Sequence, residues 1–204
     1  MKNLQGLTIK KMKVCEAGQV AVLLAHGMCR NPNHLVLFGS VSDRSLYMQT
    51  QMFKMVLEDK YNTTFIAVKD GAILGSMTYT APGYCQLQPL RLFIRLPKLI
   101  SVFKFRLPAV LKWRMVWAGH DPKEPHVHFG PIVVKESWRG MGIGKALLQH
   151  FCEYIDSKQQ SAYLETDKAD NVVLYQQFGF EITSTCNLLG NVNWFMFRSQ
   201  KRNI

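Results

Sequence analysis

Apolar residues recur at helical spacing in three parts of this chain. In the clearest pattern the repeated positions are i, i+3, i+4, i+7, i+8, i+11 and i+12, occupied by Ile143, Ala146, Leu147, His150, Phe151, Tyr154 and Ile155. This stripe predicts a helix packed on a sheet. A shorter pattern from Glu16 to His26 predicts a helix that stops at Gly27. Ser42 and Asp43 offer an N-cap for another helix that extends to about Lys60.

Strand patterns alternate with these helices. A poorly alternating first strand is expected over residues 8–14, and residues 63–68 and 72–79 flank the turn Lys69-Asp70-Gly71, which predicts a hairpin. Apolar runs at 132–134 and 162–166 predict two further strands, whereas residues 30–40 look like a loop with an apolar centre. The chain therefore combines strands and helices in one α+β domain covering residues 1–204.

A glycine-dense bend joins the strand at 132–134 to the helix that begins near Ile143. Glycine occupies positions 140, 142 and 144 of this bend. A strand, glycine turn and helix in this order direct free backbone N–H groups and the positive end of a helix dipole at one point, which binds phosphate. The spacing excludes the dinucleotide pattern G-x-G-x-x-G. It also excludes the nucleotide P-loop, because Ala146 stands where a magnesium-binding hydroxyl is required.

The remaining pattern, R-x-x-G-x-G over residues 139–144, resembles the acyl-CoA pyrophosphate loop of the GNAT superfamily of N-acetyltransferases. Residues 171–180 are similar to a second signature of that superfamily, N-x-x-x-[YF]-x-x-x-G-F, at the expected distance. The resemblance covers about the last 80 residues well and the first 80 in outline. It implies a central mixed, mostly antiparallel twisted sheet flanked by helices.

The resemblance also implies acetyl-CoA as cosubstrate and a set of cofactor-binding residues. Backbone amides of the loop would hold the pyrophosphate, the strand would hold the pantetheine arm, and Val133 or a neighbour would donate an N–H to the thioester carbonyl. Asn171 would hold the pantetheine or cap its helix. The full set is Ile132, Val133, Val134, Arg139, Gly140, Met141, Gly142, Ile143, Gly144, Lys145 and Asn171.

Two residues are the expected catalytic groups of this resemblance. Tyr175 occupies the position of the family tyrosine that protonates the coenzyme A sulfur, so we assign it as general acid. Glu165, at the end of a strand, would take the proton of the attacking amine directly or through a water. His126 and His128 are reserve bases. No metal is expected, because this His-x-His pair has no third ligand nearby in the sequence.

Residues 81–126 depart from the minimal family pattern and form a basic, aromatic insertion between the third and fourth strands. Residues 91–114 hold seven basic residues and no acid, and Pro97 and Pro108 divide the segment into three pieces, each short enough to be one helix. The insertion would be a wall over the acceptor site, a surface for an anionic partner, or a helical subdomain with solvated charges. The strand at 126–131 resembles a subgroup that includes puromycin N-acetyltransferase-like proteins.

The composition of the chain bears on its binding partners and on its cellular compartment. The formal charge of +11 suits an anionic ligand such as coenzyme A, and a nucleic acid or an anionic membrane are the other physical explanations. The five cysteines have no metal-ligand spacing, which favours reduced thiols in the cytoplasm. No apolar run is long enough to span a membrane, and the N-terminus lacks the pattern of a signal peptide.

Taken together, the sequence predicts an acetyl-CoA-dependent N-acetyltransferase that acts on a primary amine of a small molecule by direct attack in a ternary complex. The protein would be a monomer or a homodimer. One alternative is a protein or peptide amine as acceptor. The other is a non-catalytic module of the same fold that senses acyl-CoA or binds nucleic acid. The acceptor itself and the length of the acyl chain are not readable from the residues.

Overall fold

The computed structural model describes residues 4–86 and 89–201. Within these residues seven strands form one sheet in the order β1-β2-β3-β4-β5-β7-β6, and β4 and β5 are its parallel pair. The strands are β1 (Thr8–Lys11), β2 (Asn62–Lys69), β3 (Ala72–Thr80), β4 (Val127–Val134), β5 (Ala162–Thr166), β6 (Glu181–Leu188) and β7 (Asn191–Arg198). The other neighbours are antiparallel. This confirms the predicted α+β class and the mixed, mostly antiparallel sheet.

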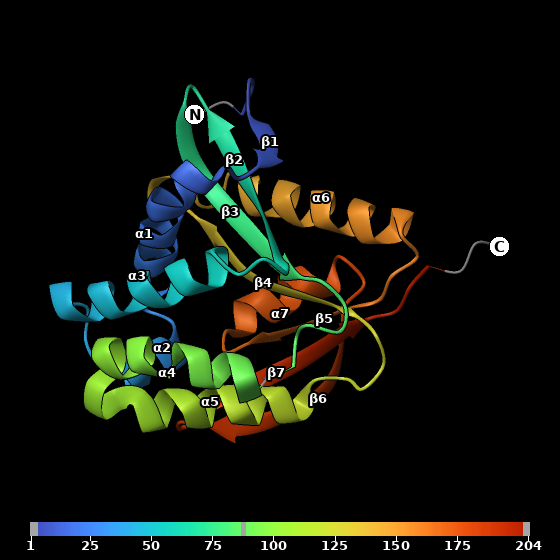
Figure 1. Ribbon diagram of the computed structural model, residues 1–204. Coiled ribbons are helices and arrows are strands. Elements are labelled where there is room, and N and C mark those ends of the chain that lie inside the picture. The colour runs from blue at the N-terminus through green and yellow to red at the C-terminus, as the bar shows by residue number, and fades with distance from the viewer. Residues whose placement is uncertain (1–3, 87–88, 202–204) are drawn as a thin grey trace.

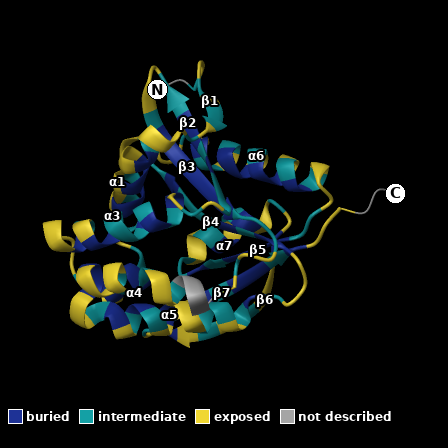
Figure 2. Cartoon of the chain, viewed as in Figure 1, coloured by how far each residue is buried: buried dark blue, intermediate teal, exposed yellow. Residues whose placement is uncertain are grey.

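Helices cover both faces of the sheet (Figure 1). They are α1 (Ala17–Met28), α2 (Pro32–Phe38), α3 (Asp43–Leu57), α4 (Pro89–Phe103), α5 (Leu107–His120), α6 (Ile143–Ser157) and α7 (Ala169–Gln176), with short 3-10 turns η1 (Val14–Glu16), η2 (Lys104–Arg106) and η3 (Glu136–Trp138). On one face α1 and α3 share a buried cluster with Ile66; on the other α6 and α7 share a buried cluster with Ala67. Successive strand residues point to opposite faces, and the central strands β3, β4 and β5 are buried or half-buried along most of their length (Figure 2).

The first strand ends at Lys11, short of the predicted 8–14, and two predictions about residues 16–40 are wrong. Helix α1 does not stop at Gly27 but continues to Met28. A Cβ built on Gly27 would collide with Val133 Cγ2, so the glycine lets α1 approach β4 closely. The segment expected to be a loop forms α2, which begins with Pro32, a residue favoured in the first helical turn, and buries Leu37 and Phe38.

The insertion lies where it was expected, but it folds as two helices joined by a 3-10 turn and not as three. Helix α4 continues through Pro97. Pro97 is exposed, so the carbonyl that its missing N–H leaves unpaired can be hydrated. Pro108 lies in the first turn of α5, where proline is well tolerated. Phe103 and Trp113 pack the two helices against α2 and α3.

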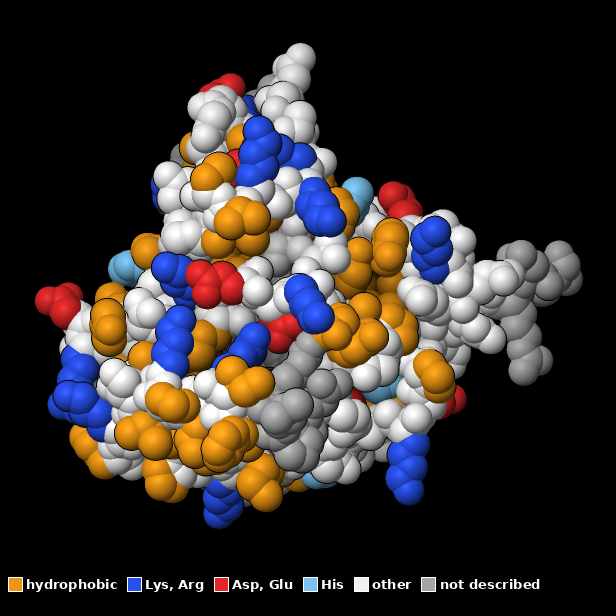
Figure 3. Space-filling view, viewed as in Figure 1, with side chains coloured by type: hydrophobic (Ala, Val, Ile, Leu, Met, Phe, Trp, Pro, Cys, Tyr) orange, Lys and Arg blue, Asp and Glu red, His pale blue; other side chains and the backbone are white. Residues whose placement is uncertain are grey.

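The outer face of the insertion combines apolar and basic side chains (Figure 3). Phe93 and Phe105 are 74% and 71% exposed, and Ile94 and Met115 are also exposed. Arg106 turns inward and donates a hydrogen bond of 2.7 Å to the carbonyl of Leu37, which attaches the insertion to α2. An anionic partner for this face stays a prediction. No helix among the described residues is long and apolar enough to cross a bilayer, and all five cysteines are free.

A bidentate ion pair fixes the C-terminal end of the sheet to α6 and gives a stability prediction. Arg198 Nη1 and Nη2 lie 2.7 and 3.0 Å from the carboxylate of Asp156, and the Arg198 side chain is 7% exposed. Replacing Asp156 with asparagine leaves this guanidinium buried without its counter-charge. The free energy of unfolding should fall by about 2 kcal/mol at neutral pH, measured by urea denaturation.

The pH dependence of this effect has a defined sign. Hydrogen bonds from Arg198, with burial opposing them, hold the pKa of Asp156 below its ordinary value. The stabilisation is therefore complete above the unfolded pKa of about 3.9 and is lost as the pH falls through the folded value. Wild type and Asp156→Asn should converge in strongly acidic solution. Glu153→Gln, an exposed charge removal on the same helix, is the control and should change stability by less than about 0.5 kcal/mol.

Candidate active site

The site begins where β4 and β5 separate. The two strands pair only at Val127 with Ala162 and at His128 with Tyr163. Beyond His128, β4 remains paired with β3 alone, and two residues, Gly130 and Pro131, lie between the paired positions Phe129 and Ile132. This irregularity bends the strand away from its neighbour. The edge of β4 that faces β5 is therefore open.

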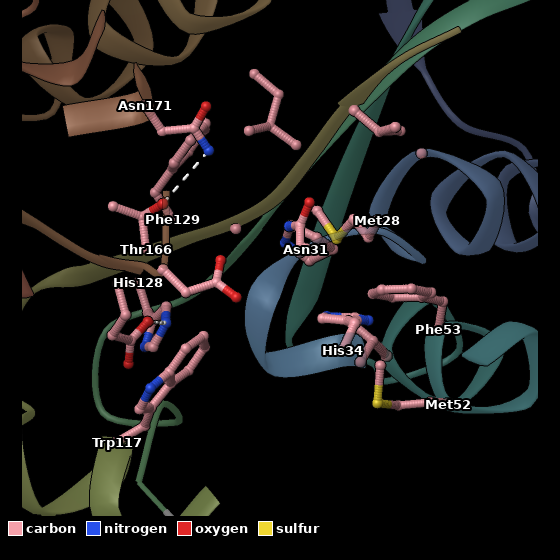
Figure 4. A pocket seen from close by; sticks show the side chains of 18 of the residues that line it. Met28, Asn31, His34, Met52, Phe53, Trp117, His128, Phe129, Thr166 and Asn171 are labelled. Atoms are coloured by element: carbon pink, nitrogen blue, oxygen red, sulfur yellow. Dashed lines mark hydrogen bonds and ion pairs between the residues drawn. The ribbon is translucent and has the colours of Figure 1, made fainter. Parts of the chain in front are cut away.

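A cavity of about 1190 Å³ occupies this opening and continues beneath the insertion. Its lining includes β4 from His128 to Val134, the bend at 139–145, the end of β5 and helix α7. Figure 4 shows its two sides: Phe129, Thr166 and Asn171 face Met28 and Asn31 across the space. The opposite wall comes from α2 and α3, and the floor from α5, with His34, Met52, Phe53 and Trp117 among the labelled residues.

The glycine bend lines this cavity and has the properties of an anion site. Gly142 has φ +85° and is the N-cap of α6, with no side chain capping the helix. The first helical hydrogen bond is donated by Ala146 to the Gly142 carbonyl at 2.9 Å. The N–H groups of Ile143, Gly144 and Lys145 thus have no helical acceptor. These amides and the helix dipole fit a pyrophosphate.

The side chains of the other residues in the bend do not all face the cavity. Arg139 lines the cavity, but its guanidinium donates a 3.0 Å hydrogen bond to the carbonyl of Gly27. The side chain of Ile143 is buried in the core, so only its backbone can serve a ligand. Met141 is the member of the predicted set that is absent from the cavity lining.

The hydrogen-bond pattern of β4 decides which amides face the opening. Lys135 donates to the carbonyl of Leu74 on β3 at 2.7 Å. Because antiparallel strands alternate the direction of their backbone groups, Val133 also directs its N–H at β3. Ile132 and Val134 then direct theirs at the open edge. The sequence assigned the oxyanion donor to Val133 or a neighbour. This hydrogen-bond pattern favours the neighbours, Ile132 and Val134.

Glu165 stands at the end of β5 in a cluster of ionisable groups. Glu165 Oε2 lies 2.8 Å from His128 Nε2, and Asp121 Oδ1 lies 2.9 Å from His126 Nε2. Burial opposes protonation of both histidines, but Glu165 and Asp121 outweigh it and raise the pKa of His128 and of His126 to about 10. Burial alone would raise the pKa of Cys85, yet its hydrogen bonds with both histidines lower that pKa to about 7.

Tyr175 lies on α7 beside the cavity, 5% exposed, with its ring centroid 6.2 Å from that of Phe129. Burial, assisted by Asp167, raises its pKa, so the hydroxyl keeps its proton at neutral pH. Asn171, on the same helix, donates to Thr166 Oγ1 at 3.3 Å. The N-cap of α7 is Lys168, so the helix-capping alternative for Asn171 is wrong.

A buried polar network near the acceptor side was not expected from the sequence. The Asn33 amide N–H donates to Asp167 Oδ2 at 2.7 Å, and Asn33 Nδ2 donates to Asn193 Oδ1 at 2.6 Å. Trp117 of the insertion donates to the same Asn193 oxygen at 3.1 Å. The network joins α2, α5, β7 and the β5–α7 loop. No sequence signal points to it, because its members are far apart in the chain and belong to no motif.

The open strand pair and the uncapped N-terminus of α6 suit the extended arm and the pyrophosphate of an acyl-CoA, as in an acyl-CoA-dependent acyltransferase. The family is shown by sequence: residues 35–180 match the model of the Acetyltransferase (GNAT) family. The chain belongs to this family and is a GNAT N-acetyltransferase. Enzymes of the family use acetyl-CoA as acyl donor.

Solved structures agree with this fold. A histone acetyltransferase HPA2 and related acetyltransferase from Corynebacterium glutamicum is 19% identical, with 97% of this chain and 98% of that chain covered and a TM-score of 0.73. An agmatine N-acetyltransferase is 10% identical over 94% and 98% of the chains, with a TM-score of 0.63. A GNAT acetyltransferase from Brucella melitensis in complex with acetyl-CoA is 12% identical over 97% and 90%, with a TM-score of 0.56. At these identities the likeness concerns the fold.

Proposed function

We propose that this enzyme transfers the acetyl group of acetyl-CoA to a primary amine of a small molecule, by direct attack in a ternary complex. The observation that carries the proposal is the continuous cavity that joins the helix N-terminus at Gly142 to an aromatic chamber under the insertion. Trp113 and Trp117 of α5 and Phe103 of α4 line that chamber. A small amine fits inside this space, whereas the bulk of a folded protein would remain outside it.

The charge of the cavity supports an amine as acceptor. The chain carries a formal charge of +11, yet the cavity lining includes Glu165, Asp167 and Asp170 near the end of β5. Carboxylates in a partly desolvated chamber attract a cationic amine and can take its proton. The aromatic walls would hold the apolar part of the same molecule.

The residues divide the reaction as follows. Acetyl-CoA supplies the acetyl group: the amine nitrogen forms a bond to the acyl carbon as the carbon–sulfur bond breaks. The N–H groups at 142–145 hold the pyrophosphate, and the N–H of Ile132 or Val134 polarises the acyl carbonyl. Glu165 accepts the amine proton, and Tyr175 gives its proton to the departing sulfur.

Sequence resemblance supports a finer grouping within the family. The strand His126–Pro131 and the run Leu164-Glu165-Thr166 are similar to segments of the puromycin N-acetyltransferase-like subgroup. We propose membership of that subgroup, in which the edge of this strand lines the acceptor pocket.

An amine screen with thiol release as readout tests the proposed acceptor class. Small primary amines with an aromatic or apolar body should be acetylated, and lysine-containing peptides and folded proteins should be poor acceptors. Faster acetylation of a peptide or protein would assign the alternative acceptor. Acetyl-CoA binding without acetylation of any amine would support the non-catalytic module.

Replacing Tyr175 with phenylalanine tests the assignment of this residue as general acid. The ring keeps its contacts with Phe129 and Phe180, and only the proton donor is lost. The turnover number should fall by about 100-fold, with the dissociation constant for acetyl-CoA nearly unchanged. Steady-state kinetics and calorimetry measure the two quantities. Tyr154→Phe, on α6 outside the cavity lining, is the matched control, and an equal loss in both variants would contradict the role of Tyr175.

A further inference from the structure

We propose a zinc site formed by Cys85, His126, His128 and Asp121 at the base of the insertion. The sequence provides only the two histidines of the His-x-His pair. Folding brings a third ligand to them: the ligand atoms of Cys85, His126 and His128 all lie within 4.8 Å of one another. Ligand atoms of a tetrahedral zinc are about 3.5 Å apart, so small side-chain adjustments close the site.

Asp121 would complete the set as the fourth ligand by moving toward Cys85, because among the described residues the group whose ligand atoms all lie within 4.8 Å of one another is Cys85, His126 and His128. Its Oδ1 lies 2.9 Å from His126 Nε2 and 3.8 Å from His128 Nδ1, between the two imidazoles. The side chain of Asp121 is 2% exposed. One thiolate, two imidazoles and one carboxylate are a donor set that suits Zn²⁺ better than Mg²⁺ or Ca²⁺.

Hydrogen bonds orient both rings for this role. His126 Nδ1 lies 2.8 Å from the carbonyl of Glu124, which can only accept, so Nδ1 carries a hydrogen. The other nitrogen of a neutral ring, Nε2, then directs a lone pair at the Asp121 carboxylate. Two acceptors that face each other require a proton or a cation between them.

The same arrangement holds at His128. Its Nε2 lies 2.8 Å from Glu165, which leaves Nδ1 directed toward Asp121. A carbonyl and a carboxylate behind the two rings are the usual outer partners of metal-binding histidines. Gln86 Nε2 adds a hydrogen bond to the second oxygen of Asp121. Three of the four proposed ligands, His126, His128 and Asp121, are therefore held by outer hydrogen-bond partners.

Burial and access also fit a metal. Two carboxylates, Asp121 and Glu165, are almost fully buried beside two imidazoles and a thiol. Protonation of both histidines balances these two negative charges in the metal-free protein, and a divalent cation would take the place of the two protons. A second cavity of about 440 Å³ is lined by Cys85, Asp121 and His126 and would provide an entry path for the metal.

The site has four protein ligands, which is typical of structural zinc. Cys85 precedes α4 and Asp121 follows α5, so the metal joins both ends of the insertion to β4. Because zinc binding to a folded site adds to the free energy of folding, the insertion would be held over the acceptor chamber by the metal. Bound zinc also fixes His128 with its hydrogen on Nε2, directed at Glu165.

Cobalt titration of the metal-free full-length protein, prepared without a polyhistidine tag, tests the site. We expect one Co²⁺ per chain, intense visible bands of tetrahedral cobalt, and a near-ultraviolet thiolate-to-cobalt band, with both signals abolished by one equivalent of Zn²⁺. Zn²⁺ and not Mg²⁺ should raise the unfolding temperature. Absence of stoichiometric binding, or octahedral spectra without a thiolate band, would overturn the proposal.

Variants assign the ligands. Cys85→Ser should remove the thiolate band and weaken Zn²⁺ binding by more than about 100-fold, while Gln86→Ala should weaken it by about 10-fold through Asp121. Cys15→Ser, which removes an exposed cysteine of η1, is the matched control and should bind like wild type. If Cys85→Ser does not fold, the Gln86→Ala titration and the wild-type cobalt spectrum still show whether the site exists. A thiolate band that survives Cys85→Ser, or that depends on Cys15, overturns the assignment.

Discussion

Replacing Gly142 with glutamate is expected to abolish acetyl-CoA binding, measured by calorimetric titration, with a rise in the dissociation constant of at least about 100-fold. Gly142 has φ +85° at the N-cap of α6, where a side chain is strained and would project beside the free amides. The added carboxylate would also place a negative charge where the pyrophosphate is expected. It would repel the phosphates and offset their attraction to the positive end of the helix dipole.

The matched control is Gly71→Glu. Gly71 lies in the β2–β3 turn with φ +76°, has open space where a Cβ would project, and is outside the cavity lining. This variant carries the same added charge and a similar backbone strain. It should bind acetyl-CoA and desulfo-CoA like wild type. Normal binding by Gly142→Glu, or equal loss in both variants, would contradict the pyrophosphate site.

Replacing Glu165 with glutamine is expected to reduce the turnover number by about 100- to 1000-fold, because the amine proton loses its acceptor. Glutamine keeps the shape of the side chain, and its carbonyl oxygen can still accept from His128 Nε2. Acetyl-CoA affinity should therefore stay near that of wild type. Steady-state kinetics with an accepted amine and calorimetry with acetyl-CoA separate the two effects.

Glu181→Gln is the control for this experiment, since Glu181 is an exposed glutamate at the start of β6 and does not line the cavity. Its turnover should equal that of wild type. A Glu165→Gln enzyme with wild-type turnover would assign proton removal to water or to another group. Zn²⁺ affinity should change little in this variant, because His128 keeps a hydrogen-bond acceptor. The experiment therefore tests the role of Glu165 as base separately from the proposed zinc site.

Local features were predictable because each depends on neighbouring residues. The bend at 139–144 requires glycine at specific backbone angles, and its spacing to the following helix can be read directly from the sequence. The hairpin was predictable for the same reason: Asp70 and Gly71 both have positive φ in the turn. The position of Ser42 as N-cap of α3 is confirmed by the hydrogen bond from the Ser45 amide to its side chain.

Predictions failed where a distant contact outweighed a local preference. Gly27 looked like a helix end, but its small size serves the close approach of α1 to Val133, more than 100 residues away in the chain. The segment at 32–38 looked like a loop, but burial of Leu37 and Phe38 against α4 and α5 stabilises it as a helix. Pro97 was expected to end a helix, and the helix continues through it.

By itself the sequence indicated the α+β class, the glycine bend proposed to hold the cofactor, the family and the two candidate catalytic residues, because these follow from local periodicity and short motifs. Only the tertiary structure decided how β4 and β5 separate, which amides of β4 face the opening, and how the insertion covers the chamber. It also decided that Cys85 and Asp121 meet His126 and His128. The physical reason is that chain spacing fixes contacts within a turn or a helix, whereas packing of distant segments fixes which side chains share a site.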